Sequence, residues 1–193
     1  MVSPQLETTA VAGRLAEEVE EEISRAWQRL KLQSDFDIPP QLRIPHLSFQ
    51  LLSGPFSRAN LAALEDLAAR RSPVEIQLSG LGLFSEPRSV LYITVVRSRH
   101  LENLHRDITL TLAEQGFSPH PLYRPEAWVP HISLAFDGLN SEDWRSLTRL
   151  EQKGAFHRRC LLRSIIVLSM EKGYPLITEV PLGSPREEQS DFP

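Results

Sequence analysis

The feature that most constrains this chain is a short pattern that occurs twice, as Pro45-His46-Leu47-Ser48-Phe49 and as Pro130-His131-Ile132-Ser133-Leu134. Both copies read Pro-His-apolar-Ser-apolar, and their histidines, at positions 46 and 131, stand 85 positions apart. With this chain's own residue usage, chance predicts roughly 0.03 copies in the whole sequence. Two copies are therefore hard to attribute to chance.

If each copy is a β-strand, the side chains of its histidine and serine point to one face and the apolar side chains to the other. The polar face then carries His46, Ser48, His131 and Ser133. The apolar face is predicted for Leu47, Phe49 and Leu51, and for Ile132, Leu134 and Phe136. The apolar face can pack, which leaves two imidazoles and two hydroxyls on rigid elements, where catalytic groups are best held.

This combination of side chains suits acid–base chemistry on a substrate that both histidines face. Imidazole titrates near neutral pH, so one histidine can accept a proton while the other donates one. The two hydroxyls can donate hydrogen bonds to oxygens that gain charge in the transition state. A lone histidine on a strand is usually structural. Burying two His-Ser pairs costs free energy unless each pair finds hydrogen-bond partners, so two such pairs favour a functional interpretation.

The two motifs resemble those of the two-histidine phosphoesterases, a family that includes 2′-5′ RNA ligase-like proteins and cyclic nucleotide phosphodiesterases. The resemblance covers roughly residues 38 to 183, and Trp128-Val129-Pro130 before His131 looks especially like the family's usual context. It implies an α+β fold with pseudo-twofold symmetry and two lobes, whose antiparallel sheets form a central cleft with helices packed outside. It also implies hydrolysis of phosphodiesters, commonly 2′,3′-cyclic ends, without a metal or other cofactor.

Under this resemblance His46 and His131 are the expected catalytic residues, and Ser48 and Ser133 the expected phosphate-binding residues. Which histidine is the base stays open, and reversal of the same proton flow would join RNA ends instead of hydrolysing a phosphodiester. The alternative from another class is a module that binds an RNA end or nucleotide without turnover. No Walker loop, dinucleotide fingerprint or zinc motif competes with these interpretations.

Composition limits the partners. The 193 residues carry a formal net charge of −4, which does not suit a protein that coats long nucleic acids and favours a nucleotide or the end of an RNA. No apolar run approaches the ~20 residues that span a bilayer, and the acidic N-terminal region lacks a signal pattern. Cys160 is the single cysteine, which suits a reducing cytoplasm and a buried structural role. A cytoplasmic monomer is expected.

Periodicity predicts the elements between the motifs. Helices are predicted over Ala12–Leu32, Ser57–Arg71, Leu101–Gln115 and from Ser141 to Gln152. Strands are predicted over Gln41–Leu52, Val74–Phe84, Ser89–Val96, Arg159–Glu171 and Leu176–Leu182, in addition to the second motif. A turn is predicted over Asp35–Pro40, where two prolines forbid helix.

The N-terminus departs from the family resemblance, which implies a clear strand before the first helix. Leu6 to Val11 is only a weak candidate, so this strand is expected to be missing or built differently. Residues 1–33 are predicted as a helical segment of the same domain as 34–183. The polar residues 184–193 are predicted to be a disordered tail.

Further substrate contacts are expected from the aromatic and basic residues near the motifs. Tyr92 and Phe84 either border the substrate or pack, and Trp128 either contacts the substrate or shields its strand. Tyr123 and Arg124 lie in a loop that leads into the second motif, where aromatic rings can stack on bases. Arg43 and Lys172 are, with Arg124, candidate phosphate contacts. The histidines His100, His105, His120 and His157 lie outside the motifs and are expected to be structural or solvent-facing.

Overall fold

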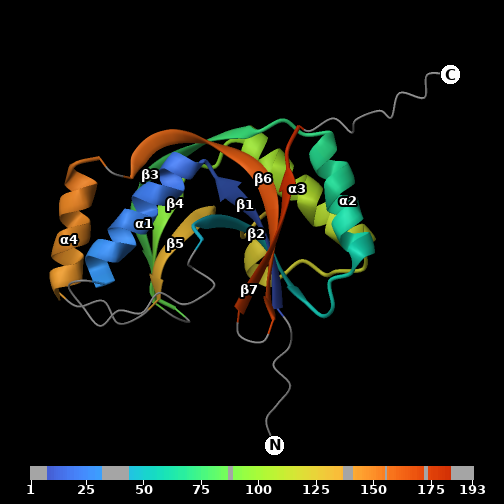
Figure 1. Cartoon of the computed structure of the whole chain (residues 1–193), viewed down its shortest axis with the longest axis horizontal. Coiled ribbons are helices and arrows are strands. Elements are labelled where there is room, and N and C mark those ends of the chain that lie inside the picture. The colour runs from blue at the N-terminus through green and yellow to red at the C-terminus, as the bar shows by residue number, and fades with distance from the viewer. Residues whose placement is uncertain are drawn as a thin grey trace, which may run out of the picture.

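A computed structural model of the protein describes residues 8–31, 44–86, 89–136, 141–154, 156–171 and 174–183. Helices and antiparallel strands alternate along these residues, which gives an α+β fold (Figure 1). The strands are β1 (Thr8–Leu15), β2 (His46–Ser53), β3 (Val74–Phe84), β4 (Val90–Val95), β5 (His131–Phe136), β6 (His157–Glu171) and β7 (Tyr174–Pro181). The helices are α1 (Glu17–Lys31), α2 (Arg58–Ala69), α3 (Arg99–Glu114), α4 (Ser141–Gln152) and a short 3₁₀ helix, η2 (Pro121–Tyr123).

The chain contains two structural repeats that exchange strands. The first repeat is β1-α1-β2-α2-β3, and the second is β4-α3-β5-α4-β6. In each repeat the first two strands pair with each other, while the third strand pairs with the first strand of the other repeat: β3 with β4, and β6 with β1. The sheet order β1-β2-β5-β4-β3-β6-β7 places the two motif strands, β2 and β5, next to each other.

The long strand β6 connects both halves of the sheet. Its first residues, from His157 to Leu162, pair with β3, and residues from Leu162 onward pair with β1. The later part of β6 also pairs with β7. Because β1 contacts both β2 and β6, the six strands of the two repeats form a closed circuit.

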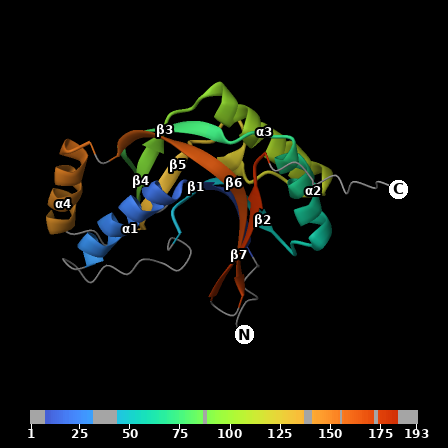
Figure 2. The same cartoon turned by 45° about the horizontal axis from the view of Figure 1, so that its top comes forward.

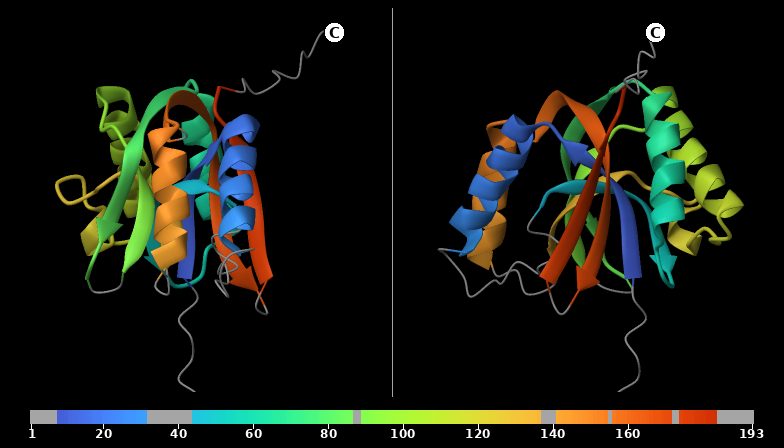
Figure 3. Two further views of the ribbon diagram at one scale, coloured as in Figure 1. Left: turned by 90° about the vertical axis from the view of Figure 1, so that its left-hand side faces the viewer. Right: turned by 45° about the vertical axis from the view of Figure 1, so that its right-hand side comes forward.

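The helices lie outside the sheet in two pairs, each with one helix from each repeat. Helices α1 and α4 run together on one side of the molecule, and α2 and α3 on the other (Figures 2 and 3). Ser57 and Ser98 cap α2 and α3 by accepting backbone N–H groups, as serine favours at helix starts. None of the described helices is long and apolar enough to span a bilayer.

The two motif strands share one irregularity, a β-bulge at the third residue after each histidine. In β2, Ser48 pairs with Ala12 and Gln50 with Val11, so Phe49 has no partner on β1. In β5, Ser133 pairs with Tyr92 and Ala135 with Leu91, so Leu134 is skipped in the same way. Because a bulge inserts one extra residue, the side chains after it point to the opposite face of the sheet from the one that strict alternation predicts.

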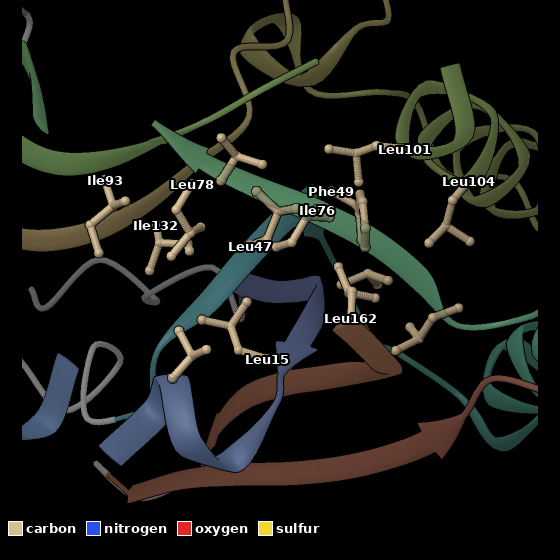
Figure 4. Packing of buried hydrophobic residues seen from close by; sticks show 14 of the residues in the cluster. Leu15, Leu47, Phe49, Ile76, Leu78, Ile93, Leu101, Leu104, Ile132 and Leu162 are labelled. Carbon is tan, nitrogen blue, oxygen red and sulfur yellow. The ribbon is translucent and has the colours of Figure 1, made fainter. Parts of the chain in front are cut away.

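The bulge corrects the apolar face predicted from strict alternation. Gln50 is buried and Leu51 only half-buried, and in β5 Ala135 is buried while Phe136 is half-buried. Leu47 and Phe49 enter the core as predicted. There they lie among Ile76 and Leu78 of β3 and among leucines of α3 (Figure 4).

The N-terminal helix begins later than predicted, because Thr8–Leu15 forms β1. The β-branched residues Thr8, Thr9 and Val11 favour an extended chain, whereas the acidic run from Glu17 belongs to the first helical turn, where the helix dipole favours negative charge. The strand that the family resemblance implies is therefore present. The predicted turn at 35–40 and the tail at 184–193 lie outside the described residues.

Candidate active site

The two histidines and two serines of the motifs lie around the single residue pair that joins β2 to β5. Strands β2 and β5 pair antiparallel at a single position, Leu47 with Ile132, and both of these side chains are buried. This register sets His46 across from Ser133 and Ser48 across from His131, on the face opposite the core. The chain thus brings together the two histidines and two serines that the sequence singled out. We call these four residues the motif square.

The rings of His46 and His131 are held in the same way. Nδ1 of His46 lies 2.8 Å from the carbonyl oxygen of Ile44, and Nδ1 of His131 lies 2.7 Å from that of Val129. A carbonyl only accepts, so Nδ1 carries the proton in both rings. Nε2 of each neutral ring is therefore the nitrogen that can accept a proton.

Burial lowers the pKa of both motif histidines. Desolvation is the largest cause for each, and the bond to the preceding carbonyl opposes it. The pKa of His46 is lowered further by the charge of His131, which places the two rings within electrostatic reach of each other. Both rings are therefore mainly neutral at pH 7, and a bound anion would favour protonating one of them.

An aromatic cluster borders the second histidine. The rings of Phe84 and Tyr92 stack with centroids 4.2 Å apart, and His131 lies 5.0 Å from Phe84 and 5.2 Å from Tyr92. A side chain at Gly82 would meet the Tyr92 ring at 2.4 Å, so glycine leaves the space that this ring fills. Tyr92 is half-buried beside the motif square, as a substrate contact would require.

Unlike Tyr92, Trp128 is buried, with 1% of its surface exposed. Its ring stacks on His105 at 4.0 Å, and its Nε1 donates to the carbonyl of Ser48 at 3.0 Å. Of the two roles expected for Trp128, the structure therefore favours shielding and support of the motif strand. His105 is buried as well, and desolvation lowers its pKa to about 4.

Trp27 supports the other motif strand in a matching way. It projects from α1, and its Nε1 donates to the carbonyl of Leu134 at 2.8 Å. Each tryptophan thus satisfies a carbonyl at a bulge of the motif strand from the other repeat. Trp27 lies within the helix predicted over Ala12–Leu32, but no sequence signal shows that its ring reaches β5.

Arg14 lies next to His46, because the two residues pair between β1 and β2. The sequence prediction placed Arg14 in a helix and did not identify it as a neighbour of His46. The β-branched residues before Arg14 were the signal that could have indicated a strand. Its guanidinium bonds to Glu20 at 3.0 Å and also to Glu179, which in turn accepts from Ser164 at 2.7 Å. Two carboxylates thus compensate the charge of Arg14. Burial raises the pKa of Glu20, and the hydrogen bond from Arg14 opposes that rise.

Three of the remaining candidates, Arg124, His100 and His157, are exposed. Arg124 is exposed, and its carbonyl accepts from the backbone of Trp128 at 2.8 Å. Arg43 and Lys172 lie outside the described residues. His100 is exposed and His157 pairs with Glu151 on the surface. Among the described residues, no group of three or more histidine, cysteine or acidic side chains could hold a metal ion. Cys160 is half-buried, and burial raises its pKa to about 11.

Comparisons with known proteins identify a family and similar folds. The family model described as the 2′-5′ RNA ligase superfamily matches residues 19–173. The crystal structure of TT0787 of Thermus thermophilus superposes with a TM-score of 0.64 at 17% identity, over 92% of this chain and 98% of that one. E. coli LigT complexed with 3′-AMP gives 0.59 at 18% identity, over 93% and 99%. No curated protein sequence matches significantly.

Proposed function

Because the chain belongs to the 2′-5′ RNA ligase superfamily, whose model matches residues 19–173, we propose that it is a phosphodiesterase that hydrolyses 2′,3′-cyclic phosphate ends of nucleotides or RNA. The observation that carries this proposal is the motif square. Two histidines with Nδ1 tied to a carbonyl and Nε2 available stand beside two hydroxyl donors on one face of the sheet. Paired proton transfer to and from a phosphodiester needs this set of groups.

The proposed reaction needs one proton accepted and one donated. One neutral histidine removes a proton from water at Nε2, and the water oxygen forms a bond to phosphorus. The bond from phosphorus to one ribose oxygen breaks, and the second histidine, protonated at Nε2, gives its proton to that oxygen. Ser48 and Ser133 donate hydrogen bonds to the non-bridging oxygens, which gain charge. If a 5′-hydroxyl takes the place of water and the bond from phosphorus to the 3′ oxygen breaks, the same two proton transfers would join two ends as a 2′-5′ linkage.

The aromatic cluster supports a nucleotide as substrate. The half-buried ring of Tyr92 lies beside His131, where a base or sugar attached to the bound phosphate could lie against it. Arg124, exposed in the loop before the second motif, is proposed as an outer contact. E. coli LigT, which has a similar fold, has been crystallised with 3′-AMP and with ATP, which supports a nucleotide as the substrate class.

The test is hydrolysis of nucleoside 2′,3′-cyclic phosphates by the single variants His46→Ala and His131→Ala. Each histidine is expected to contribute at least 10²-fold, so each variant should lose at least that much of kcat/KM. His100→Ala, an exposed histidine on α3, is the matched control and should keep full activity. EDTA should leave the wild-type rate unchanged, since the proposed steps use no metal.

The outcome also separates an enzyme from a binding module. Full activity in His46→Ala or His131→Ala would refute the assignment of these residues. Wild-type protein that binds 3′-AMP but turns over no cyclic phosphate would favour a module that holds an RNA end. A rate abolished by EDTA would show that a metal takes part in the reaction.

A further inference from the structure

Strands β2 and β5 carry the two motif histidines, yet the sheet joins these strands at one residue pair, Leu47 with Ile132. Each further pair in a ladder adds hydrogen bonds that hold two strands in one register. One pair constrains the angle between the strands only weakly. The distance between the rings of His46 and His131 therefore depends on contacts outside this ladder.

Gln50 supplies such a contact from β2, because the bulge at Phe49 turns its side chain into the core. Its Nε2 donates to the carbonyl oxygen of Tyr123 at 2.9 Å and to Thr109 Oγ1 at 2.9 Å, and its Oε1 accepts from the backbone N–H of His120 at 3.3 Å. Separating a buried amide from its partners is costly. Gln50 therefore holds the loop that precedes the second motif.

The carbonyl of Tyr123 has a second buried partner, His105 of α3. Nε2 of this ring lies 3.0 Å from the carbonyl oxygen. A carbonyl oxygen has two lone pairs, so it can accept from the Gln50 amide and from the imidazole at once. The backbone at this point is thus held from β2 of the first repeat and from α3 of the second.

Further bonds connect the held loop to the second motif. The carbonyl of Arg124 accepts from the backbone N–H groups of Ala127 at 2.9 Å and Trp128 at 2.8 Å, which closes a tight turn. The Trp128 indole is buried and donates to a carbonyl of β2. The next carbonyl, that of Val129, lies 2.7 Å from Nδ1 of His131. A displacement of the loop therefore reaches the ring that the proposed reaction uses.

We propose that Gln50 is a positioning residue: its amide fixes the loop before the second motif and thereby sets the place of His131 relative to His46. The inference deepens the proposed function, on which it rests for the reaction. Gln50 lies on the core side of β2 and acts through the loop backbone. The matching position in β5 is Ala135, which has no polar side chain, so the bridge runs only from the first motif to the second.

Loss of this bridge should slow proton transfer more than it weakens binding. Both imidazoles must lie within hydrogen-bond reach of one phosphodiester, and a small misplacement of either ring slows the reaction strongly. A serine hydroxyl can rotate to suit its acceptor, so phosphate binding tolerates a shift that proton transfer does not. The expected signature is therefore a fall in kcat with little change in KM.

The experiment compares Gln50→Met with the wild type and with Thr109→Val. Methionine keeps the unbranched shape of glutamine but lacks its amide. Thr109→Val removes the partner on α3 and leaves the bonds from the amide to the loop, so it is the matched control. With adenosine 2′,3′-cyclic phosphate, Gln50→Met is expected to lower kcat roughly 10-fold to 100-fold and to change KM less than about threefold. Thr109→Val should keep the wild-type kcat at temperatures well below its unfolding transition.

A second readout does not depend on turnover. Long-range correlation NMR spectra of nitrogen-labelled protein show which ring nitrogen of each histidine carries the proton. Both motif histidines of the wild type should carry it on Nδ1, bonded to the preceding carbonyl. Gln50→Met should leave His46 in this tautomer and give His131 a mixture of the two. Thr109→Val should leave both rings unchanged.

Wild-type kcat together with unchanged tautomers in Gln50→Met would overturn the proposal. A rise in KM at constant kcat would do so too, as would an equal loss of kcat in Thr109→Val, which would assign the effect to packing at α3. If Gln50→Met does not fold, His105→Phe takes its place, because it removes the other donor to the Tyr123 carbonyl and keeps a flat ring. Wild-type kcat and tautomers in that variant would count against the proposal equally.

The two readouts also separate this inference from the proposed function. Wild-type protein that hydrolyses no cyclic phosphate, while the tautomer of His131 still depends on Gln50, would sink the proposed function alone. Hydrolysis that persists unchanged in Gln50→Met, with His131 still protonated on Nδ1, would sink the inference alone.

Discussion

A main-chain carbonyl two residues earlier sets the tautomer of His46 and of His131. Each ring then gains or loses its proton at Nε2 alone, which is the nitrogen left for the substrate. Because burial lowers both pKa values, the free protein holds two neutral rings at pH 7. In the proposed reaction, the negative charge of a bound phosphodiester would favour protonating one ring, so the substrate would help to create the acid that acts on it.

The pH dependence of kcat/KM should follow from these shifts. The proposed reaction needs one neutral and one protonated ring, and burial holds the pKa of both rings below the usual 6.5. Two interacting rings titrate as a pair with two macroscopic pKa values. We expect a bell-shaped profile whose optimum lies below pH 6.5, with activity falling as pH rises above it. The profile of kcat should lie at higher pH, since bound phosphate raises the pKa of the ring that donates.

Initial rates over roughly pH 4 to 9 at constant ionic strength would measure both profiles. The profiles report the pKa values of the two histidines when the chemical step limits turnover, which a viscosity control checks. A kcat/KM optimum above pH 7, or a flat profile, would be incompatible with two desolvated histidines that share one phosphate.

At the scale of single residues, the sequence predicted the motif square but not its surroundings. Period-two alternation placed His46 beside Ser48 and His131 beside Ser133, since two residues separate side chains on one face. The same rule failed at Gln50 and Leu51, because a bulge depends on how the strand pairs with β1, which no local pattern reveals. Tyr123 was predicted as a substrate contact, but the bond that its carbonyl accepts from Gln50 is a tertiary contact that no local pattern reveals.

At the scale of elements, the two bulges and their tryptophans connect the repeats. Trp128 donates to Ser48 in β2, and Trp27 donates to Leu134 in β5. Strands β2 and β5 pair at only one position, so carbonyls near the bulges need partners other than strand neighbours. Each indole supplies one, and each thereby supports the part of a motif strand that carries a serine.

We predict that Trp27→Phe and Trp128→Phe both lower stability and kcat. Each change leaves a buried carbonyl without its donor, which costs about 1–3 kcal/mol, and lets the motif strand relax. Urea unfolding and turnover of a cyclic phosphate are the measurements. Trp144→Phe is the matched control, because Trp144 is partly exposed on α4 and, within the part of the chain that the structure describes, its indole donates to no motif strand.

If the indole bonds matter, the two buried variants change together and the control stays at wild-type values. Equal effects in all three variants would mean that loss of ring area, and not the N–H bond, decides the result. Wild-type kcat in both buried variants would show that the bulges hold their shape without these donors.

Most elements were predictable because their local signals agree with the fold. Val74–Phe84 forms β3 with the predicted bounds and pairs with β4 as a hairpin, and Ser57 caps α2. The exception is β1. Its residues Ala12 and Leu15 fit both a helical and an extended pattern, and only pairing with β2 and β6 decides between them. Pairing between strands that are distant in the sequence does not appear in the local periodicity of apolar residues.

At the scale of the whole molecule, buried neutral histidines connect stability to pH. His105 is 1% exposed between α3 and the loop at Tyr123, and its pKa falls to about 4. An unfolded chain binds a proton on this residue below about pH 6.5, whereas the folded chain does not. The free energy of unfolding should therefore fall as pH drops from about 6.5 to about 4, by up to about 1.4 kcal/mol per pH unit for this proton.

Urea unfolding at several pH values in this window would measure the slope. His105→Phe removes the titrating group and keeps a flat ring against Trp128, so its slope should be shallower, although the variant starts less stable at pH 7. An unchanged slope in His105→Phe would assign the pH dependence to other groups, His46 and His131 first.

The path of β6 has a consequence for how this protein is made. Both motif histidines leave the ribosome before residue 157, but β1 and β3 have no β6 to pair with until that later stretch emerges. A nascent chain halted at α4 thus holds every residue of the motif square while two strands still lack a neighbour. The assembled motif square should therefore arise late in synthesis and in one step, when the last long strand closes the circuit.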